Sequence, residues 1–570
     1  MGSKDMGVLL TFVLMAMCFS SVRPEAQYLD FVVEEKVFTR LCSSKSMLVV
    51  NGSFPGPVIK VHKGDTVYVN VHNRGTSGLT MHWHGVMQPR NPWFDGPEYI
   101  TQFNFTTEEG TVWWHAHSDW TRASVHGAIV IYPAEGSTYP FQQPDADEVL
   151  VLGSWYIDDY QELVDYDLAE GTDLPTSDAY TINGQPGDFC PCSNESTYRW
   201  YVDFGKTYHV RIVNADMNAE LFLAIASHNL VVVGMDGGYV KPFVTDYIMI
   251  SPGQTIDVLL VANQSLGHYY IVARQYYSGK LLYTEFDKTN ASAILQYRGS
   301  YAPPEEPELP VHLPSYYDID AQIQFTRKLR SLASVDHPVD VPLDISTRMY
   351  VTASINIFWY ASERMGSSLN NISWVNPHTD VLSAYYRNTS GFYTTDFPDQ
   401  PPTFFNFTAD DLLVNTTEPI QGTKVKVLNY GEEVEMVYQG TNILNASVAH
   451  PMHLHGYTFY VVGLGGGNYN PETDPKTFNL IDPPRLNTIS IPRSGWVAVR
   501  FKATNPGVWL WHCHLERHFT WGMNTVLIAK DGGTPETSLK APPPYMPACE
   551  PAALALEPRG LNDHSGTDVD

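Results

Sequence analysis

One pattern occurs three times along the chain, and it restricts the fold more than any other feature of the sequence. A glycine and two polar residues precede a short run of alternating apolar side chains, starting at Gly64, at Gly205 and at Gly431. Short alternating runs closed by Gly and Pro are typical of strands in β-sandwiches and barrels. Copies this far apart indicate duplicated domains, since a solenoid repeats about every 20 to 50 residues. We therefore expect an all-β chain of three sandwich or barrel domains.

The segments between the copies indicate where the domains end. A loop over 133–147 closes the first copy, and the Pro- and Glu-rich segment Pro303–Pro310 separates the second from the third. The expected organisation is a signal peptide over 1–26, domain 1 over 27–135, domain 2 over 147–300, a linker over 301–345, domain 3 over 346–549 and a C-terminal tail over 550–570.

The N-terminus and the glycosylation triplets indicate export. Lys4 precedes an apolar run over 7–19, which has the length of a signal-peptide core and is shorter than the roughly 20 residues that span a bilayer. Ten Asn-X-Ser/Thr triplets are candidate N-glycan sites. They begin at Asn51, Asn104, Asn194, Asn263, Asn290, Asn371, Asn388, Asn406, Asn415 and Asn445. We expect a secreted glycoprotein of the extracellular space, with no membrane span.

The charge balance restricts the partners. The chain carries 35 Lys and Arg against 62 Asp and Glu, which gives a net charge of −27. A surface this acidic repels polyanions, so nucleic acid is excluded as the main partner. We expect a soluble monomer that acts on small molecules.

Histidines concentrate in four short windows, 82–84, 115–117, 450–455 and 512–518. These windows hold ten of the 20 histidines, where an even distribution would place about one. In each His-X-His pair both rings lie on one face of a strand, so a pair can bridge neighbouring metal ions. The pairs are His82 and His84, His115 and His117, His453 and His455, and His512 and His514. Eight imidazoles suit a cluster of copper or zinc ions where domains 1 and 3 meet.

Cys513 favours copper over zinc. It lies between His512 and His514, so its sulfur points to the opposite face of the strand. The candidates to join it there are His450, His518 and Met523. Two His, one Cys and a distant Met form a blue-copper electron-transfer set, whereas zinc has no redox chemistry. Because Cys513 is covalently continuous with two cluster histidines, an electron would need on the order of 10 Å of chain to reach the cluster.

Together these motifs resemble the multicopper oxidases, and more narrowly the plant laccases, over about residues 30–549. The resemblance implies three cupredoxin-like domains and four copper ions that pass electrons from phenolic donors to O2. The implied type 1 ligands are His450, Cys513, His518 and Met523. The implied type 2 ligands are His82 and His453. The implied type 3 ligands are His84, His115 and His514 for one ion and His117, His455 and His512 for the other.

Two acidic residues are candidates for proton supply. Asp95 occupies a position whose acid in similar enzymes lies near the type 2 copper, and Glu516 is the second candidate. An axial Met523 predicts a low to middling potential. The expected donors are therefore easily oxidised ones: monolignols, catechols or flavonoids.

Three alternatives remain open. An ascorbate oxidase would share every copper ligand, and a ferroxidase would need carboxylates around the donor-side histidine. The third is a copper-depleted, poorly active glycoprotein. Here Gln102 runs directly into Phe103, where the resemblance implies a strand-plus-turn segment with a cysteine that pairs near the C-terminus. Cys549 would then lack its partner.

The remaining cysteines allow more than one arrangement. Four cysteines besides Cys513 are expected in the mature chain, and sequence alone permits three pairings among them. The resemblance implies a link between Cys42 and Cys192, which leaves Cys190 as an odd residue.

Overall fold

The structure is a computed structural model that describes residues 26–546, apart from 77, 96–99, 106–107, 280–285, 360–362, 411, 413–417 and 545. The expected signal peptide up to residue 25, Cys549 and the tail over 550–570 lie outside the described residues. Within the described part, no helix combines the length and the apolar character needed to cross a bilayer.

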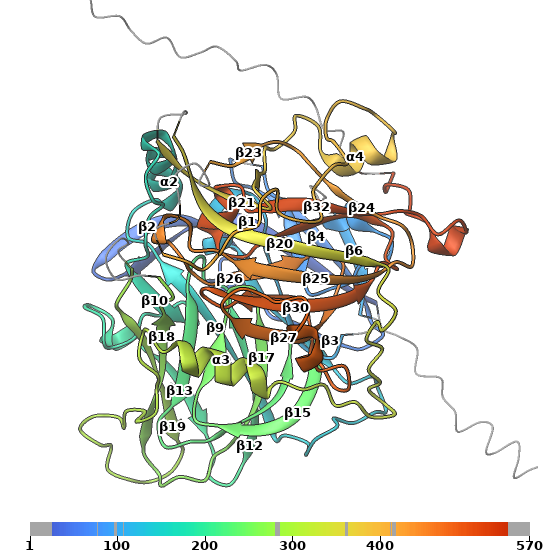
Figure 1. Cartoon of the computed structure of the whole chain (residues 1–570). Coiled ribbons are helices and arrows are strands. Elements are labelled where there is room, and N and C mark those ends of the chain that lie inside the picture. The colour runs from blue at the N-terminus through green and yellow to red at the C-terminus, as the bar shows by residue number, and fades with distance from the viewer. Residues whose placement is uncertain are drawn as a thin grey trace, which may run out of the picture.

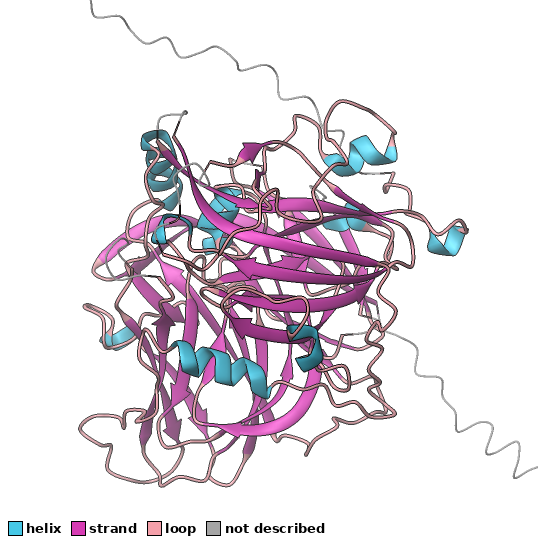
Figure 2. Cartoon of the chain, viewed as in Figure 1, coloured by secondary structure: helices cyan, strands magenta, loops and turns pink. Residues whose placement is uncertain are grey.

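The described residues form six sheets that make three sandwiches, so the all-β prediction is confirmed (Figures 1 and 2). The strands of the first sandwich lie behind the orange and red strands of the third in Figure 1, and the second sandwich occupies the lower part of the view. Figure 2 shows that strands predominate and that the helices are short segments.

The first sandwich has two four-stranded sheets. One has the order β2 (Ser43–Val50), β1 (Ala26–Arg40), β4 (Thr66–Asn73) and β6 (Ile100–Asn104). The other has the order β3 (Ile59–His62), β8 (His126–Tyr132), β7 (Gly110–Ala116) and β5 (Met81–His84).

The second sandwich pairs a six-stranded with a five-stranded sheet. The first has the order β10 (Ala179–Ile182), β9 (Ala146–Trp155), β12 (Thr207–Asn214), β17 (Thr255–Val261), β14 (Leu230–Met235) and β15 (Gly238–Thr245). The second has the order β11 (Tyr198–Val202), β19 (Asn290–Tyr297), β18 (His268–Tyr276), β13 (Glu220–Ile225) and β16 (Ile248–Ile250).

The third sandwich has an eight-stranded and a five-stranded sheet. The first has the order β23 (Ile420–Gln421), β22 (Ile372–Ser373), β21 (Arg364–Leu369), β20 (Thr347–Phe358), β25 (Glu433–Gly440), β30 (Gly495–Lys502), β27 (Phe459–Gly466) and β28 (Arg485–Leu486). The second has the order β24 (Lys426–Leu428), β32 (Asn524–Ala529), β31 (Gly507–Cys513), β26 (His450–Leu454) and β29 (Thr488–Ile491).

Helices are short and few among the described residues. The α-helices are α2 (Tyr160–Glu170), α3 (Ile319–Lys328), α4 (Val381–Tyr386) and α5 (Glu516–Thr520). The 3-10 helices are η1 (Pro92–Asp95), η2 (Asp119–Ala123), η3 (Asn194–Ser196), η5 (Ile443–Asn445), η6 (Asp474–Thr477) and η7 (Pro535–Thr537).

The three glycines of the sequence repeat occupy equivalent turns. Gly64, Gly205 and Gly431 have φ of +98°, +81° and +82°, a left-handed conformation that favours glycine, and each turn leads into β4, β12 or β25. Each of these strands pairs in parallel with an earlier strand of its own sandwich, namely β1, β9 or β20. The repeat therefore marks the same structural position three times.

Two features join the sandwiches. A disulfide between Cys42 and Cys192, with 5.3 Å between the Cα atoms, ties the first to the second and confirms that predicted link. Cys190 is a buried free thiol. One continuous apolar cluster spans the second and third sandwiches and includes Cys513 and Met523, so the packing of these two sandwiches against each other also buries both residues.

Candidate metal centre

The eight paired histidines come from two ladders with the same register. In the first sandwich β5 pairs antiparallel with β7, which sets His82 opposite His115. In the third sandwich β26 pairs antiparallel with β31, which sets His453 opposite His512. Because side chains alternate along a strand, the second histidine of each His-X-His motif projects from the same face as the first. The two ladders meet with their histidine faces together, and the ring centroids of His84 and His453 are 3.8 Å apart.

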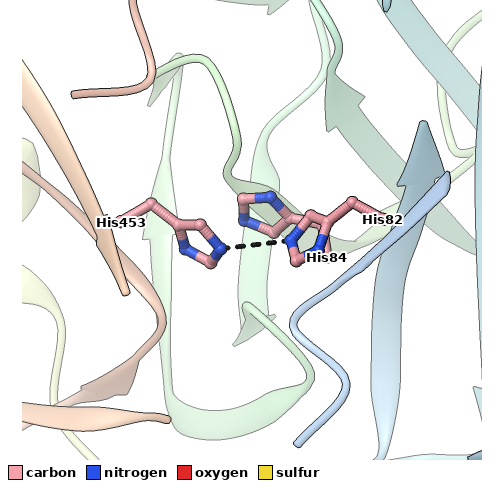
Figure 3. A group of neighbouring side chains, drawn as sticks. All are labelled: His82, His84 and His453. Carbon is pink, nitrogen blue, oxygen red and sulfur yellow. Dashed lines mark hydrogen bonds between the residues drawn. The ribbon is translucent and has the colours of Figure 1, made fainter. Parts of the chain in front are cut away.

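The structure brings these eight side chains into three groups, two of which share His84. In each group the ligand atoms all lie within 4.8 Å of one another. The groups are His82 with His84 and His453, His84 with His115 and His514, and His117 with His455 and His512. Figure 3 shows the first group, in which the rings of His82 and His84 approach His453 from the opposite side. Histidines of the first and third sandwiches thus contribute to every group.

Hydrogen bonds determine which ring nitrogen faces the centre of the cluster. His115 donates from Nδ1 to Ala116 O (2.8 Å), and His512 donates from Nδ1 to Cys513 O (2.9 Å), so each keeps the lone pair on Nε2. His84 is reversed, because its Nε2 lies 3.0 Å from Asn487 Oδ1. Its lone pair is therefore on Nδ1.

These lone pairs fit a bound metal ion. In the described part of the chain, His84 Nδ1 and His115 Nε2 are buried without a hydrogen-bond partner. Nε2 of His82 and Nε2 of His453 face each other at 3.3 Å, the approach drawn as a dashed line in Figure 3. Buried polar atoms normally have a partner, and neutral imidazole nitrogen is a common ligand for copper. The donor set therefore suits copper, and a cluster of cations would satisfy the nitrogens that the protein leaves unpaired.

Burial keeps the histidines neutral. Desolvation holds the pKa of His84, His115, His453, His512 and His514 well below the ordinary value, and neighbouring histidines lower it further. Arg122 adds to this effect at His514, where it is the second cause after burial. A neutral imidazole is the form that binds metal. The fold therefore presents the ligands in the binding form before any ion arrives.

A fourth group lies on the other side of β31. It contains His450, Cys513 and His518. Nδ1 of His518 lies 3.5 Å from Cys513 Sγ and 3.1 Å from Nδ1 of His450. Met523 is fully buried, and its main chain is hydrogen-bonded to both Cys513 (3.0 Å) and His518 (2.9 Å).

Burial shifts the pKa values of the histidine and the cysteine of this group in opposite directions. Desolvation lowers the pKa of His450 to about 3 and raises the pKa of the Cys513 thiol. The histidine is therefore ready to bind an ion, whereas the thiol needs the positive charge of the ion to lose its proton.

The two acid candidates have different surroundings. Asp95 is the last residue of η1, and its side chain lies outside the described residues. Glu516 is buried at the start of α5, where its Oε2 lies 3.2 Å from Nη2 of Arg122. Glu516 also lines a cavity of about 690 Å³ together with His117 and His455.

Arg122 is a feature that the sequence did not reveal. Its guanidinium is 2% exposed and contacts the ring of His514, and it donates to Met217 O at 3.2 Å. No motif marks this arginine, because its partners lie far away along the chain.

A second cavity, of about 120 Å³, lies against His518. Its wall contains aromatic rings and four carboxylates that the sequence did not place. The carboxylates belong to Asp173, Asp216, Glu220 and Asp287. Burial raises the pKa of Asp216 to about 6 and that of Glu220 to about 7. Four carboxylates that the sequence analysis did not identify therefore line the same cavity as His518.

Comparisons with known proteins cover nearly the whole chain. Three family models described as multicopper oxidase match residues 32–136, 146–300 and 396–533. Laccase-14 of Arabidopsis thaliana is 46% identical, over 96% of this chain and 98% of the relative. Putative laccase-9 of Oryza sativa subsp. japonica is also 46% identical, over 96% of this chain and 100% of the relative.

Solved structures share the architecture. The laccase from Botrytis aclada superimposes with a TM-score of 0.70 at 24% identity, over 91% of this chain and 89% of that one. Fet3p, a multicopper oxidase that functions in iron import, gives a TM-score of 0.67 at 21% identity, over 88% of this chain and 90% of that one. At these identities the two matches establish the fold alone.

Proposed function

The chain belongs to the multicopper oxidases and is a laccase-type oxidoreductase with four copper ions, and from this premise we propose that it is a secreted oxidase of phenolic donors. The observation that carries the proposal is strand β31. Together with the residue that follows it, His514, this strand places Cys513 in one group and its neighbours His512 and His514 in two others. Covalent continuity between a donor-side group and an oxygen-side cluster is what an electron path requires.

The proposed ligand sets follow the four groups. Type 1 copper would be held by His450, Cys513, His518 and Met523. Type 2 copper would be held by His82 and His453. The type 3 ions would be held by His84, His115 and His514, and by His117, His455 and His512. Bound copper supplies one-electron oxidation of the donor at the first site and four-electron reduction of O2 to water at the others.

The protein's own residues bind the donor and handle protons. The cavity beside His518 is walled by aromatic rings such as Tyr277 and Phe286, which suit a phenolic ring. A phenol loses its proton as it is oxidised, and a carboxyl whose pKa is raised by burial can accept that proton near neutral pH. Asp216 and Glu220 line the same cavity and are the proposed acceptors.

On the oxygen side, Glu516 and Asp95 are the proposed proton sources. Glu516 faces the cavity that also reaches His117 and His455, so water in this cavity can return its proton. Arg122 holds the Glu516 carboxylate at 3.2 Å.

We also propose export to the apoplast, with lignin metabolism as its setting, and the domain bounds 27–135, 147–300 and 346–549. Five of the triplet asparagines, Asn51, Asn194, Asn263, Asn388 and Asn406, are exposed and so accessible to glycosylation.

A donor panel tests the function. Oxygen uptake by the purified copper-loaded protein is compared with monolignols, catechols, flavonoids, ascorbate and ferrous iron as donors. We expect the highest kcat/KM for a phenol. Ascorbate as the best donor would make the protein an ascorbate oxidase. Ferrous iron belongs in the panel because of the four carboxylates beside His518. A low copper content with no turnover would favour the copper-depleted glycoprotein.

A further inference from the structure

The second sandwich contributes no residue to the four groups found among the described residues. One of its side chains, however, accepts hydrogen bonds from the segment of the third sandwich that contacts two of the cluster histidines. We infer that Asp236 is a positioning residue for the oxygen-reducing cluster, because its carboxylate fixes the main chain that orients His84 and His453. The inference rests on the proposed assignment of these two histidines as copper ligands.

The carboxylate of Asp236 is 3% exposed and accepts three main-chain hydrogen bonds. Oδ1 accepts from Thr255 N at 3.0 Å, within the second sandwich. Oδ2 accepts from the N–H groups of Asn487 and Thr488, both at 3.2 Å, in the third sandwich. The side chain therefore fastens the segment that leads into β29 to the turn between β14 and β15.

Residues 487 and 488 in turn hold both rings. Nδ1 of His453 donates to Asn487 O at 2.8 Å. Nε2 of His84 lies 3.0 Å from Asn487 Oδ1 and 3.1 Å from Thr488 Oγ1. Thr488 Oγ1 is also 3.1 Å from Nδ1 of His453. A shift of this segment would rotate the two rings together, since each is fixed through the nitrogen that faces away from the other histidines.

The local turn does not by itself explain an aspartate here. Asp236 and Gly237 have φ of +50° and +71°, and Asp-Gly is a favoured pair for a two-residue hairpin turn. Asparagine suits such a turn equally well. What asparagine cannot supply is a second acceptor oxygen, because its amide group would point a donor at another N–H. The three accepted bonds therefore separate a positioning role from a turn role.

Water has access to the outer side of this turn. A cavity of about 270 Å³ is lined by Asp236 and by charged neighbours that include Lys63, Glu109 and Arg485. Burial raises the pKa of Asp236 to about 7, and the three N–H donors oppose that rise. The N–H donors thus favour the carboxylate form in an otherwise costly place.

The test compares Asp236→Asn with Asp216→Asn in the copper-loaded protein. Asp216 is an equally buried carboxylate of the same sandwich that accepts two main-chain N–H groups but does not touch residues 487 and 488. We expect Asp236→Asn to weaken copper binding at the His82–His453 pair about 10- to 100-fold, the usual effect of removing a group that orients a ligand. Its type 2 EPR signal should fall relative to the type 1 signal, and copper per chain should fall with it. Asp216→Asn should keep the ratio of the two signals.

A second variant, Thr488→Val, tests the same segment without changing a buried charge. Thr488→Val removes the hydroxyl that contacts both rings and keeps the shape of the side chain. It should lower the same signal, and its effect should be less than additive with that of Asp236→Asn, because both act through one segment. An unchanged type 2 signal in Asp236→Asn, or in Thr488→Val where the first variant does not fold, overturns the inference. Wild-type protein without type 2 copper would instead refute the ligand assignment.

Discussion

Substitution of Gly253 by alanine tests whether the second sandwich shapes the cluster by contact. Gly253 lies in the turn before β17 with φ of +93°, and a Cβ there would lie 2.7 Å from Cδ2 and 2.9 Å from Cγ of His514. The turn cannot retreat easily, because Trp113 Nε1 donates to Gly253 O at 3.0 Å and Gly253 N donates to Asn214 O at 3.1 Å. The ring must therefore give way.

The size of the effect follows from two contributions. A non-glycine residue in the left-handed region costs about 1–2 kcal/mol. Restoring an ordinary carbon contact of about 3.5 Å requires the His514 ring to move by about 0.8 Å. Gly64→Ala isolates the first contribution, because Gly64 has φ of +98° and a Cβ there would meet no atom within 4 Å.

In thermal unfolding of the metal-free protein, Gly253→Ala should lose at least as much stability as Gly64→Ala, because only Gly253→Ala also displaces the His514 ring, and the two variants should differ in copper. Gly253→Ala should bind fewer copper ions per chain and lose the spectroscopic features of coupled type 3 copper, whereas Gly64→Ala should keep them. Metal analysis and absorption spectra of the two reconstituted proteins measure the difference. Equal copper contents with intact type 3 features would refute the claim that this turn sets the position of His514.

Three further predictions concern the type 1 group, acid and the first sandwich. Cys513→Ser should abolish the blue colour and phenol oxidation together, because a hydroxyl cannot replace the soft thiolate, and turnover that survives would contradict the proposed ligand set. Burial lowers the pKa of His126 in the folded state from 6.5 to about 4. Between these pH values the unfolded chain binds a proton at His126 and the folded chain does not, so the free energy of unfolding falls by up to about 3 kcal/mol as the pH drops from 6.5 to 4. In metal-free protein, His126→Gln should reduce the fall in melting temperature between pH 6.5 and pH 4. An unchanged fall would show that other groups control the pH dependence. Insertion of a strand-plus-turn segment with its cysteine after Gln102 should raise copper per chain. A disulfide between this cysteine and Cys549 should add about 2 to 5 kcal/mol to the free energy of unfolding, as checked by peptide mapping and melting temperature. Equal copper contents and equal melting temperatures in the two forms would show that β6 already closes the sheet adequately.

Features that depend on short stretches of sequence could be predicted. The turns before β4, β12 and β25 could be predicted from their glycines, because only glycine adopts φ near +90° without strain. The period of two along a strand places both histidines of a His-X-His motif on one face and Cys513 on the other. These are local rules, and three equivalent turns in three sandwiches follow from them.

Features that join distant segments could not be predicted. Asp236 is 251 residues from Asn487, and no period or motif connects the two. Arg122 meets His514 across 392 residues. The carboxylates beside His518 come from several loops and strands of the second sandwich, so their convergence depends on how the sandwiches pack.

The orientation of the histidine rings is partly predictable from the sequence and partly not. His115 and His512 each donate from Nδ1 to the carbonyl of the next residue, so the motif contains the group that fixes its own ring. His453 instead donates to Asn487 O, a carbonyl from another segment, which Asp236 holds from another sandwich. Imidazole lone pairs that face one another repel and cannot hold their own arrangement, so an external group has to do so wherever the adjacent carbonyl does not. His453, which we propose as a type 2 ligand, therefore depends on tertiary contacts more than His115 and His512, the proposed type 3 ligands on β7 and β31, do. The proposed His82–His453 site should lose copper before the sites of His115 and His512 when the contact between Asp236 and Asn487 is weakened.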